Sequence, residues 1–351
     1  MSEVVTSVEG RVGRLRLNRP KPIHALNQPM CEAMSDALLR WRDDPAIEVV
    51  ILDHAEGRGF CAGGDVVTLA KSGAARDAVA SGFFGAEYRL NHLLFTFPKP
   101  VVALMDGITM GGGVGIALPC RYRVATEHTR FAMPETTIGL FPDVGGGWYL
   151  SRLVGRVGQF LALTGARLDG AECVALGLAT HYLASADLPA LVERIVAEPG
   201  QVEQALDAAA TTPPEARIAK NLPSIARLFA SDTLEETLAA LDADGSDWAT
   251  TEAATIRTKS PLSCKVSLRV LAEGAGRTDF ADEMRAEHAL AARVIRTHDF
   301  IEGVRALLID RDNAPQWDPA TPEGVTLGML DDLFAPAPAG EEWTPFGGRR
   351  A

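Results

Sequence analysis

The chain reads PVVALMDGITMGGGVGIAL over residues 100–118, and this segment carries the clearest fold signal in the sequence. Residues 100–105 are apolar and partly β-branched, which predicts a buried strand. A glycine-rich turn follows at residues 111–113, and the small apolar residues 114–119 after it predict a short helix. A buried strand that leads through glycines into a helix is typical of α/β proteins.

The segments upstream have a related pattern. Residues 47–52 (IEVVIL) predict a second buried strand, and a second glycine-rich turn, CAGGD, follows at residues 61–65. Residues 4–7 and 11–17 alternate apolar and polar side chains, which indicates a β-hairpin. Between the hairpin and the strand, Gln28–Arg42 carries apolar residues at three- and four-residue spacing and therefore predicts an amphipathic helix.

Downstream of the first segment the strands become short and then stop. Strands are predicted at residues 122–125, 130–133 and 181–183, with helices at 144–154, 157–164 and 171–176. From about Leu188 onward the chain is rich in Ala, Leu and Glu at helical spacing. We therefore predict an α/β core at 1–190, an all-helical region at 191–334, and an extended, proline- and glycine-rich tail at 335–351.

The composition excludes several classes of protein. Asp and Glu outnumber Lys and Arg by 46 to 34, so the net charge of −12 argues against a nucleic acid or an anionic membrane as a partner. No apolar run is long enough to span a bilayer. The N-terminal residues lack the basic and apolar regions of a secretory signal, so we expect a cytoplasmic protein.

The cysteines and the known catalytic motifs narrow the chemistry. The five cysteines are widely spread and form neither a disulfide pattern nor a metal-binding pair, so no metal is expected. The glycine-rich turns lack the spacing of the dinucleotide and P-loop motifs. The esterase motif GxSxG and the zinc-protease motif HExxH are absent as well.

The two glycine-rich turns are candidates for binding an anion or a developing negative charge. Glycine allows a ligand to approach the backbone closely, and the first amides of a helix have no partner within the helix. Two such turns side by side are able to form an oxyanion hole. The alternative is that both are tight turns needed only for packing.

Three segments of the chain resemble the crotonase, or enoyl-CoA hydratase/isomerase, superfamily: GFCAGGD (59–65), DGITMGGGVG (106–115) and FAMPETTIGLFPDVGGG (131–147). With LALTGARLDG (161–170) and HDFIEGVRALLIDRD (298–312), they are most similar to its branch of 3-hydroxyisobutyryl-CoA hydrolases. The resemblance implies a crotonase-like spiral of repeated β-β-α units, with C-terminal helices that complete the pocket. It also implies that the amides of Gly64 and Gly112 together hold the thioester oxygen of an acyl-CoA.

One position departs from the hydratase pattern. Hydratases of this superfamily carry one catalytic Glu three residues after the middle glycine of the GGG turn, where this chain has Gly115, and a second at the Pro-Glu that matches Glu135. Addition of water to a C=C bond needs two positioned carboxylates. Enoyl hydration is therefore not expected.

Thioester hydrolysis needs one base or nucleophile near the carbonyl and an oxyanion site. Glu135 and Asp143 match active-site positions of the hydrolase branch, and Glu87 matches a third position that contacts substrate. The resemblance implies that Glu135 attacks the carbonyl or activates water, while Asp143 positions water and the substrate hydroxyl with help from Glu87. On capping preferences alone, Glu135 and Asp143 are also suited to helix N-termini, and Glu87 to a solvated helix face.

We expect hydrolysis of 3-hydroxyisobutyryl-CoA in valine breakdown, with CoA as part of the substrate and no separate cofactor. Two alternatives remain: an enoyl-CoA or dienoyl-CoA isomerase of the same superfamily, and a non-catalytic acyl-CoA-binding protein. A homo-oligomer is possible, because trimers and hexamers are usual in the superfamily.

Overall fold

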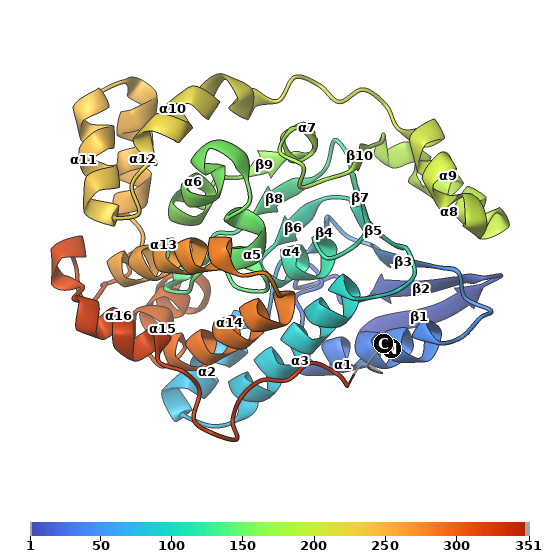
Figure 1. The fold of residues 1–351 in the computed structure, drawn as a ribbon, viewed down its shortest axis with the longest axis horizontal. Coiled ribbons are helices and arrows are strands. Elements are labelled where there is room, and N and C mark those ends of the chain that lie inside the picture. The colour runs from blue at the N-terminus through green and yellow to red at the C-terminus, as the bar shows by residue number, and fades with distance from the viewer. Residues whose placement is uncertain (1, 348–351) are drawn as a thin grey trace.

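Two β-sheets form the centre of the molecule (Figure 1). The computed structural model describes residues 2–347. The six-stranded sheet has the order β1 (Val4–Glu9), β2 (Val12–Leu17), β3 (Val49–His54), β5 (Val101–Met105), β7 (Tyr122–Ala125), β10 (His181–Tyr182). The four-stranded sheet has the order β4 (Gly59–Cys61), β6 (Ile108–Met110), β8 (Arg130–Ala132), β9 (Leu168–Asp169). Neighbouring strands are parallel except in the pairs β1–β2 and β8–β9.

The β-β-α repeat is confirmed. Each of β3, β5 and β7 in the larger sheet is followed directly by a short strand, β4, β6 or β8, in the smaller one. The prediction that the glycine turns follow the long strands directly is therefore wrong in detail, because each turn leaves from the end of a short strand of the smaller sheet. Since β4 and β6 are parallel neighbours, their two turns lie at the same edge of that sheet.

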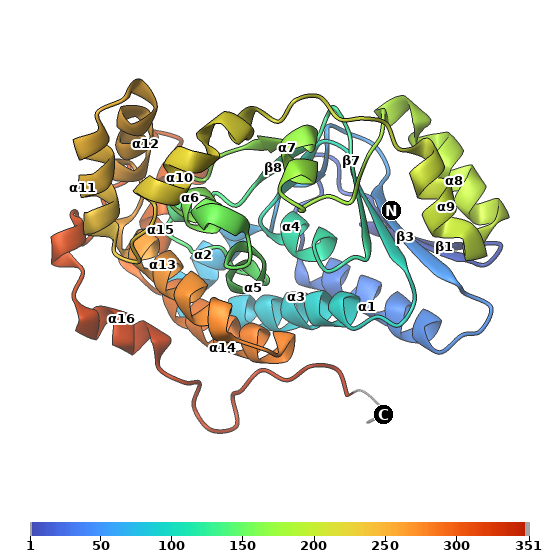
Figure 2. The same ribbon diagram turned by 45° about the horizontal axis from the view of Figure 1, so that its top comes forward.

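Helices cover both faces of the larger sheet (Figures 1 and 2). On one face lie α1 (Gln28–Arg42) and α3 (Val79–Phe95), which pack against each other and join the main apolar core. On the other face, α8 (Leu188–Ala197) and α9 (Val202–Ala209) form a second apolar cluster with the outward side chains of β2, β3, β5 and β7. The helices between these regions are α2 (Val66–Ala75), α4 (Gly112–Ala117), α5 (Gly146–Leu150), α6 (Val157–Thr164) and α7 (Gly170–Ala175).

The C-terminal region is helical, as expected, and the chain reaches it by an extended crossing from α9 to α10 (Figure 1). Its helices are α10 (Leu222–Leu228), α11 (Leu234–Asp244), α12 (Asp247–Arg257), α13 (Pro261–Gly276), α14 (Phe280–Val294), α15 (His298–Val304) and α16 (Leu327–Phe334). Helix α13 packs on α5 and α6, and α14 packs on α3. No described helix has the length and apolarity needed to cross a membrane.

The predicted domain limits relate to the fold as follows. The limit at residue 190 falls inside α8, and the division into a core and a helical region stays a prediction. The tail beyond Phe334 is extended over its described part, and it runs below α14 in Figure 2. Trp343 in this tail is buried, and Arg89 Nε on α3 donates a hydrogen bond to the carbonyl oxygen of Thr344 at 3.1 Å. Residues 348–351 lie outside the described residues.

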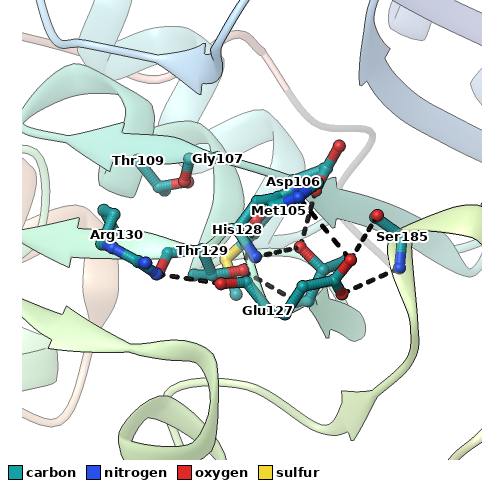
Figure 3. Close-up of polar contacts among 10 residues, drawn as sticks. Met105, Asp106, Gly107, Thr109, Glu127, His128, Thr129, Arg130 and Ser185 are labelled. Carbon is teal, nitrogen blue, oxygen red and sulfur yellow. Dashed lines mark hydrogen bonds and ion pairs between the residues drawn. The ribbon is translucent and has the colours of Figure 1, made fainter.

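A polar cluster fixes the turn between β7 and β8 to the end of β5 (Figure 3). The Thr129 hydroxyl donates to the carbonyl oxygen of Met105 at 2.6 Å and accepts from the amide of Thr126 at 2.8 Å. Asp106 accepts from the Thr126 hydroxyl at 2.6 Å and contacts His128 Nδ1 at 3.1 Å. These contacts hold the chain where it leaves β5 for β6 and the GGG turn.

We predict that Thr129→Val lowers the free energy of unfolding by about 2–4 kcal/mol. The substitution keeps the shape of a fully buried side chain but leaves a backbone donor and a backbone acceptor unpaired, and each costs about 1–3 kcal/mol. Urea unfolding measures the change. Thr251→Val on the exposed side of α12 is the control and is expected to stay within about 0.5 kcal/mol of the parent. An equal effect of both substitutions would contradict the role given to Thr129.

Candidate active site

One cavity of about 530 Å³ collects all five of the site residues predicted from the sequence. Both glycine turns contribute to its lining, as do apolar side chains of α2 and α3. Lys259, Leu307 and Leu308 come from the C-terminal region, so that region completes the pocket. The five predicted residues in the lining are Gly64, Glu87, Gly112, Glu135 and Asp143.

The two glycine turns touch each other. Gly63 has a φ of 111°, a backbone conformation that favours glycine, and a Cβ atom there would lie 3.7 Å from the amide nitrogen of Gly112. The carbonyl carbon of Gly63 would lie 3.3 Å from a Cβ at Gly112. A short parallel bridge between Leu26 and Gly64 holds the first turn in place.

The amides of Gly64 and Gly112 have no hydrogen-bond acceptor among residues 2–347. The reason differs at the two positions. Gly112 is the first residue of α4, where no intrahelical acceptor exists. At Gly64 the bridge to Leu26 uses the neighbouring groups, the carbonyl oxygen of Gly63 and the amide of Asp65. Two unpaired donors on adjoining turns of one cavity are able to bind a single ligand oxygen.

Two carboxylates lie against the GGG turn. Glu135 Oε1 lies 3.1 Å from where a Cβ at Gly111 would be, and Glu87 Oε1 would overlap a Cβ at Gly112. Each carboxylate also has a buried oxygen without a hydrogen-bond partner, Oε2 in Glu135 and Oε1 in Glu87. Buried polar atoms of native proteins are nearly always paired, so these oxygens are free for a substrate or a water molecule.

The two carboxyl groups are buried, and burial is the main cause of their raised pKa values. The pKa of Glu135, which begins the short 3₁₀ helix Glu135–Ile138, is raised well above its ordinary value by burial and then by the charge of Asp143. The pKa of Glu87 is raised well above its ordinary value by burial and then by Asp143 and Glu135. Glu87 is 2% exposed, so the solvated-face reading of this residue is wrong.

Asp143 is the third carboxylate of the cavity. Its Oδ2 accepts a hydrogen bond from the hydroxyl of Tyr88 at 2.7 Å. Burial raises the pKa of Asp143 to about 6, and the hydrogen bond from Tyr88 opposes this rise. Asp143 caps no helix with its side chain, because the N-cap residue of α5 is Gly145.

Three residues of the site were not among the predicted ones. Tyr88 follows Glu87 directly on α3, but the sequence does not show that it reaches a residue 55 positions away. Lys259, which donates from Nζ to the hydroxyl of Thr137 at 2.9 Å, and Arg167 are the two cations of the cavity lining. Lys259 lies between α12 and α13 and Arg167 follows α6. The sequence does not show that these two segments meet at one cavity.

The space beside Gly115 is already filled. A Cβ at Gly115 would lie 2.5 Å from the Cβ of Val144 and 3.1 Å from Nδ2 of Asn91. A glutamate side chain therefore has no room there in this packing. The glutamate that hydratases carry at this position is therefore excluded in two ways. Residue 115 is a glycine, and Val144 occupies the space that a longer side chain would need.

Residues 12–334 match a family model described as enoyl-CoA hydratase/isomerase. The chain is 43% identical to the mitochondrial 3-hydroxyisobutyryl-CoA hydrolase of Xenopus laevis, covering 93% of this chain and 86% of that protein. It is 40% identical to the human mitochondrial 3-hydroxyisobutyryl-CoA hydrolase, covering 95% of this chain and 88% of the human one.

Two solved structures share the fold over nearly the whole chain. A carnitinyl-CoA dehydratase from Mycobacterium thermoresistibile is 39% identical with a TM-score of 0.94, covering 99% of this chain and 100% of that one. An enoyl-CoA hydratase from Rhodobacter sphaeroides is 36% identical with a TM-score of 0.91, covering 98% and 100%.

The expected cytoplasmic location is contradicted, because the curated relatives named above are mitochondrial proteins. The expectation rested on the absence of a secretory signal. That absence argues only against the secretory route and does not distinguish the remaining compartments.

Proposed function

The chain belongs to the enoyl-CoA hydratase/isomerase family, and on this basis we propose that it hydrolyses the thioester of 3-hydroxyisobutyryl-CoA to 3-hydroxyisobutyrate and CoA. The proposed reaction is a step of valine breakdown. The observation that carries the proposal is the cavity in which two unpaired glycine amides adjoin the carboxylate of Glu135. Its carboxylates and amides meet the two needs of thioester cleavage, a nucleophile or base and an oxyanion site.

In the proposed reaction the thioester oxygen accepts hydrogen bonds from the amides of Gly64 and Gly112. Attack on the carbonyl carbon moves an electron pair onto this oxygen, and the amides stabilise the resulting oxyanion more than the neutral carbonyl. The tetrahedral intermediate then expels CoA as a thiolate, which takes up a proton. Because the donors belong to the backbone, they are held in place before the charge develops.

Glu135 acts in one of two ways. As a nucleophile, its carboxylate oxygen bonds to the carbonyl carbon, and loss of the thiolate leaves a mixed anhydride that water then cleaves. As a general base, it takes a proton from a water molecule that attacks the carbonyl directly. Asp143 orients the water and the substrate hydroxyl in both routes. Burial and its acidic neighbours favour protonated Glu87, which makes it a donor toward substrate.

The hydrolase reading fits the site better than hydration does. Hydratases of the superfamily place their second carboxylate three residues after the middle glycine of the GGG turn, and position 115 here is a glycine whose surroundings are filled by Val144 and Asn91. The other carboxylates of the cavity, Glu87 and Asp143, come from different elements. The cations Arg167 and Lys259 in the cavity lining are suited to the phosphates of a CoA ester.

A panel of purified acyl-CoA esters, scored for release of free thiol, tests the proposal. We expect the highest kcat/KM for 3-hydroxyisobutyryl-CoA and no loss of enoyl absorbance with an unsaturated ester such as crotonyl-CoA. Absorbance changes without thiol release would support an isomerase or a hydratase instead. Binding of the esters with neither change would support a non-catalytic acyl-CoA-binding protein.

The Tyr88→Phe variant is expected to move the acidic limb of the kcat/KM profile to higher pH. The hydroxyl of Tyr88 stabilises the ionised form of Asp143, so its removal raises the pKa of Asp143 further above 6. A lost hydrogen bond to a charged group is worth about 1.5–3 kcal/mol, so we expect a shift of about one to two pH units. Rate measurements from pH 4.5 to about 9 give the limb. If the acidic limb stayed at the same pH, the ionisation that limits kcat/KM would not be that of Asp143.

A further inference from the structure

The turn that carries Asp143 is held from behind by a buried carboxylate of α14. Glu287 Oε2 accepts the amide hydrogen of Gly145 at 2.7 Å, and its Oε1 accepts that of Gly147 at 3.0 Å. Glu287 is 1% exposed and does not belong to the lining of the substrate cavity. The chain separation of 140 residues or more shows that these bonds are purely tertiary.

The turn needs such support because its backbone is strained. Val144 has a φ of 52°, in the left-handed region where a β-branched residue is a rare outlier. Gly145 follows with a φ of 90°, and the amide of Gly146 closes the turn on the carbonyl oxygen of Asp143 at 2.8 Å. Strained backbone persists where the surrounding structure over-determines it.

The strained conformation has two consequences at the active site. It directs Asp143 into the cavity, where its carboxylate meets the hydroxyl of Tyr88. It also places the side chain of Val144 against Gly115, in the space that the second carboxylate of a hydratase would need. If the backbone of Val144 relaxed, the side chains of Asp143 and Val144 would both move, because the two residues are adjacent in the chain.

We propose that Glu287 is a positioning residue for the reaction: its carboxylate, by accepting the amides of Gly145 and Gly147, holds Asp143 in the cavity and Val144 over Gly115. The role rests on the proposed hydrolase function. Glu287 itself acts only through the turn. Its neighbour Glu283 on the same helix is ion-paired with Arg277 at 3.1 Å.

The Glu287→Gln variant tests the role. A glutamine side chain offers one carbonyl oxygen, so it accepts at most one of the two amides in the same way and turns an NH₂ group toward the other. We expect kcat for thioester hydrolysis to fall by about 30-fold while KM changes less than twofold, because Glu287 does not line the cavity. Glu287→Asp keeps the charge but is one methylene shorter, and its kcat is expected to lie between those of the wild type and Glu287→Gln. It replaces the glutamine variant in the test if that variant does not fold.

The chain contains a matched control. Glu172 is also buried and accepts two backbone amides, from Asp169 at 2.8 Å and Ile218 at 2.9 Å, at a site outside the substrate cavity. Because Glu172 also pairs with Arg217 at 2.9 Å, Glu172→Gln is expected to lower Tm at least as much as Glu287→Gln does and to leave kcat unchanged. If Glu172→Gln and Glu287→Gln lost kcat equally, the positioning role would be overturned, because loss of stability alone would then explain the lower rate.

A second substitution separates positioning from simple support of the fold. Val144→Gly removes the backbone strain that Glu287 has to overcome, although it also leaves a cavity beside Gly115. In the Glu287→Gln background it is expected to recover about tenfold in kcat while Tm falls further. A purely structural role predicts that both quantities fall.

The outcomes also distinguish the two proposals. If the wild-type protein releases no thiol from any short 3-hydroxyacyl-CoA, the proposed function is overturned and the positioning role with it. If the wild type releases thiol and Glu287→Gln keeps kcat within twofold, only the positioning role is overturned.

Discussion

Replacement of Glu135 by glutamine abolishes nearly all thioester hydrolysis, with an expected loss in kcat of about 10³-fold or more. Glutamine has the shape of glutamate but is neither a nucleophile nor a base at neutral pH. The oxyanion site of Gly64 and Gly112 stays intact, so a small residual rate over the uncatalysed reaction remains. Thiol release under saturating substrate measures the loss, and binding of CoA is expected to be unchanged.

The same substitution is expected to leave Tm unchanged or to raise it. Glu135 is buried among other carboxylates, its pKa is raised by that burial, and one of its oxygens has no partner. An unpaired buried carboxylate destabilises a fold, and a neutral amide of the same size relieves that cost. Loss of activity together with unchanged or increased stability would identify Glu135 as a residue kept for chemistry.

Glu193→Gln, an exposed substitution on α8, is the control and should change neither kcat nor Tm. A Glu135→Gln variant with kcat within tenfold of the wild type would contradict both routes proposed for this residue.

Label found in Glu135 after single-turnover hydrolysis in ¹⁸O-labelled water identifies the anhydride route. If Glu135 forms a mixed anhydride, water that attacks the anhydride at the carboxyl of Glu135 leaves one labelled oxygen in the enzyme. Absence of label in Glu135, with label in the released acid, is the result expected of direct attack by water or of anhydride cleavage at the substrate carbonyl. Multiple turnovers with mass analysis of the active-site peptide increase the sensitivity.

The elements that the sequence could predict are those with a local physical signal. The helix at Gln28–Arg42 begins and ends as predicted, because Asn27 caps it, a proline occupies its first turn, and its buried residues recur at helical spacing. The hairpin of β1 and β2 is recognisable from its alternation. Strands β4, β6 and β9 have only two or three residues, too few for any periodicity, and they form because tertiary packing brings them together in one sheet.

Helix α13 lies in the region predicted to be helical, but its own bounds could not be predicted. Its polar stripe is narrow, Lys265, Arg269 and Glu273, and buried serines interrupt the apolar side of Pro261–Gly276, so the helical period is weak in the sequence. Within the site, the glycines, Glu135 and Asp143 stood in recognisable motifs, whereas Tyr88 and Glu287 act on residues 55 or more positions away. Contacts of that kind come from tertiary packing and leave no mark in local sequence.

Replacement of Gly112 by alanine is the second substitution with a large expected effect, a loss in kcat of about 10²–10³-fold. The new Cβ would overlap Glu87 Oε1 and approach the carbonyl carbon of Gly63 to 3.3 Å, so the turn, the carboxylate or both must move. Because the two turns touch, a shift at Gly112 also changes the distance between the amides of Gly112 and Gly64. Two donors that no longer converge on one oxygen lose transition-state stabilisation even when both are present.

Gly276→Ala provides the matched control for this substitution. Gly276 ends α13, no atom lies within 4 Å of a Cβ placed there, and its φ is not in the left-handed region. The control is expected to keep kcat and to gain about 0.4–1 kcal/mol of stability, because alanine restricts the unfolded chain. If Gly112→Ala kept kcat within a factor of about three while folding normally, the amide of Gly112 would not be an oxyanion donor. The requirement for glycine at this position would then be explained by the space that Glu87 occupies.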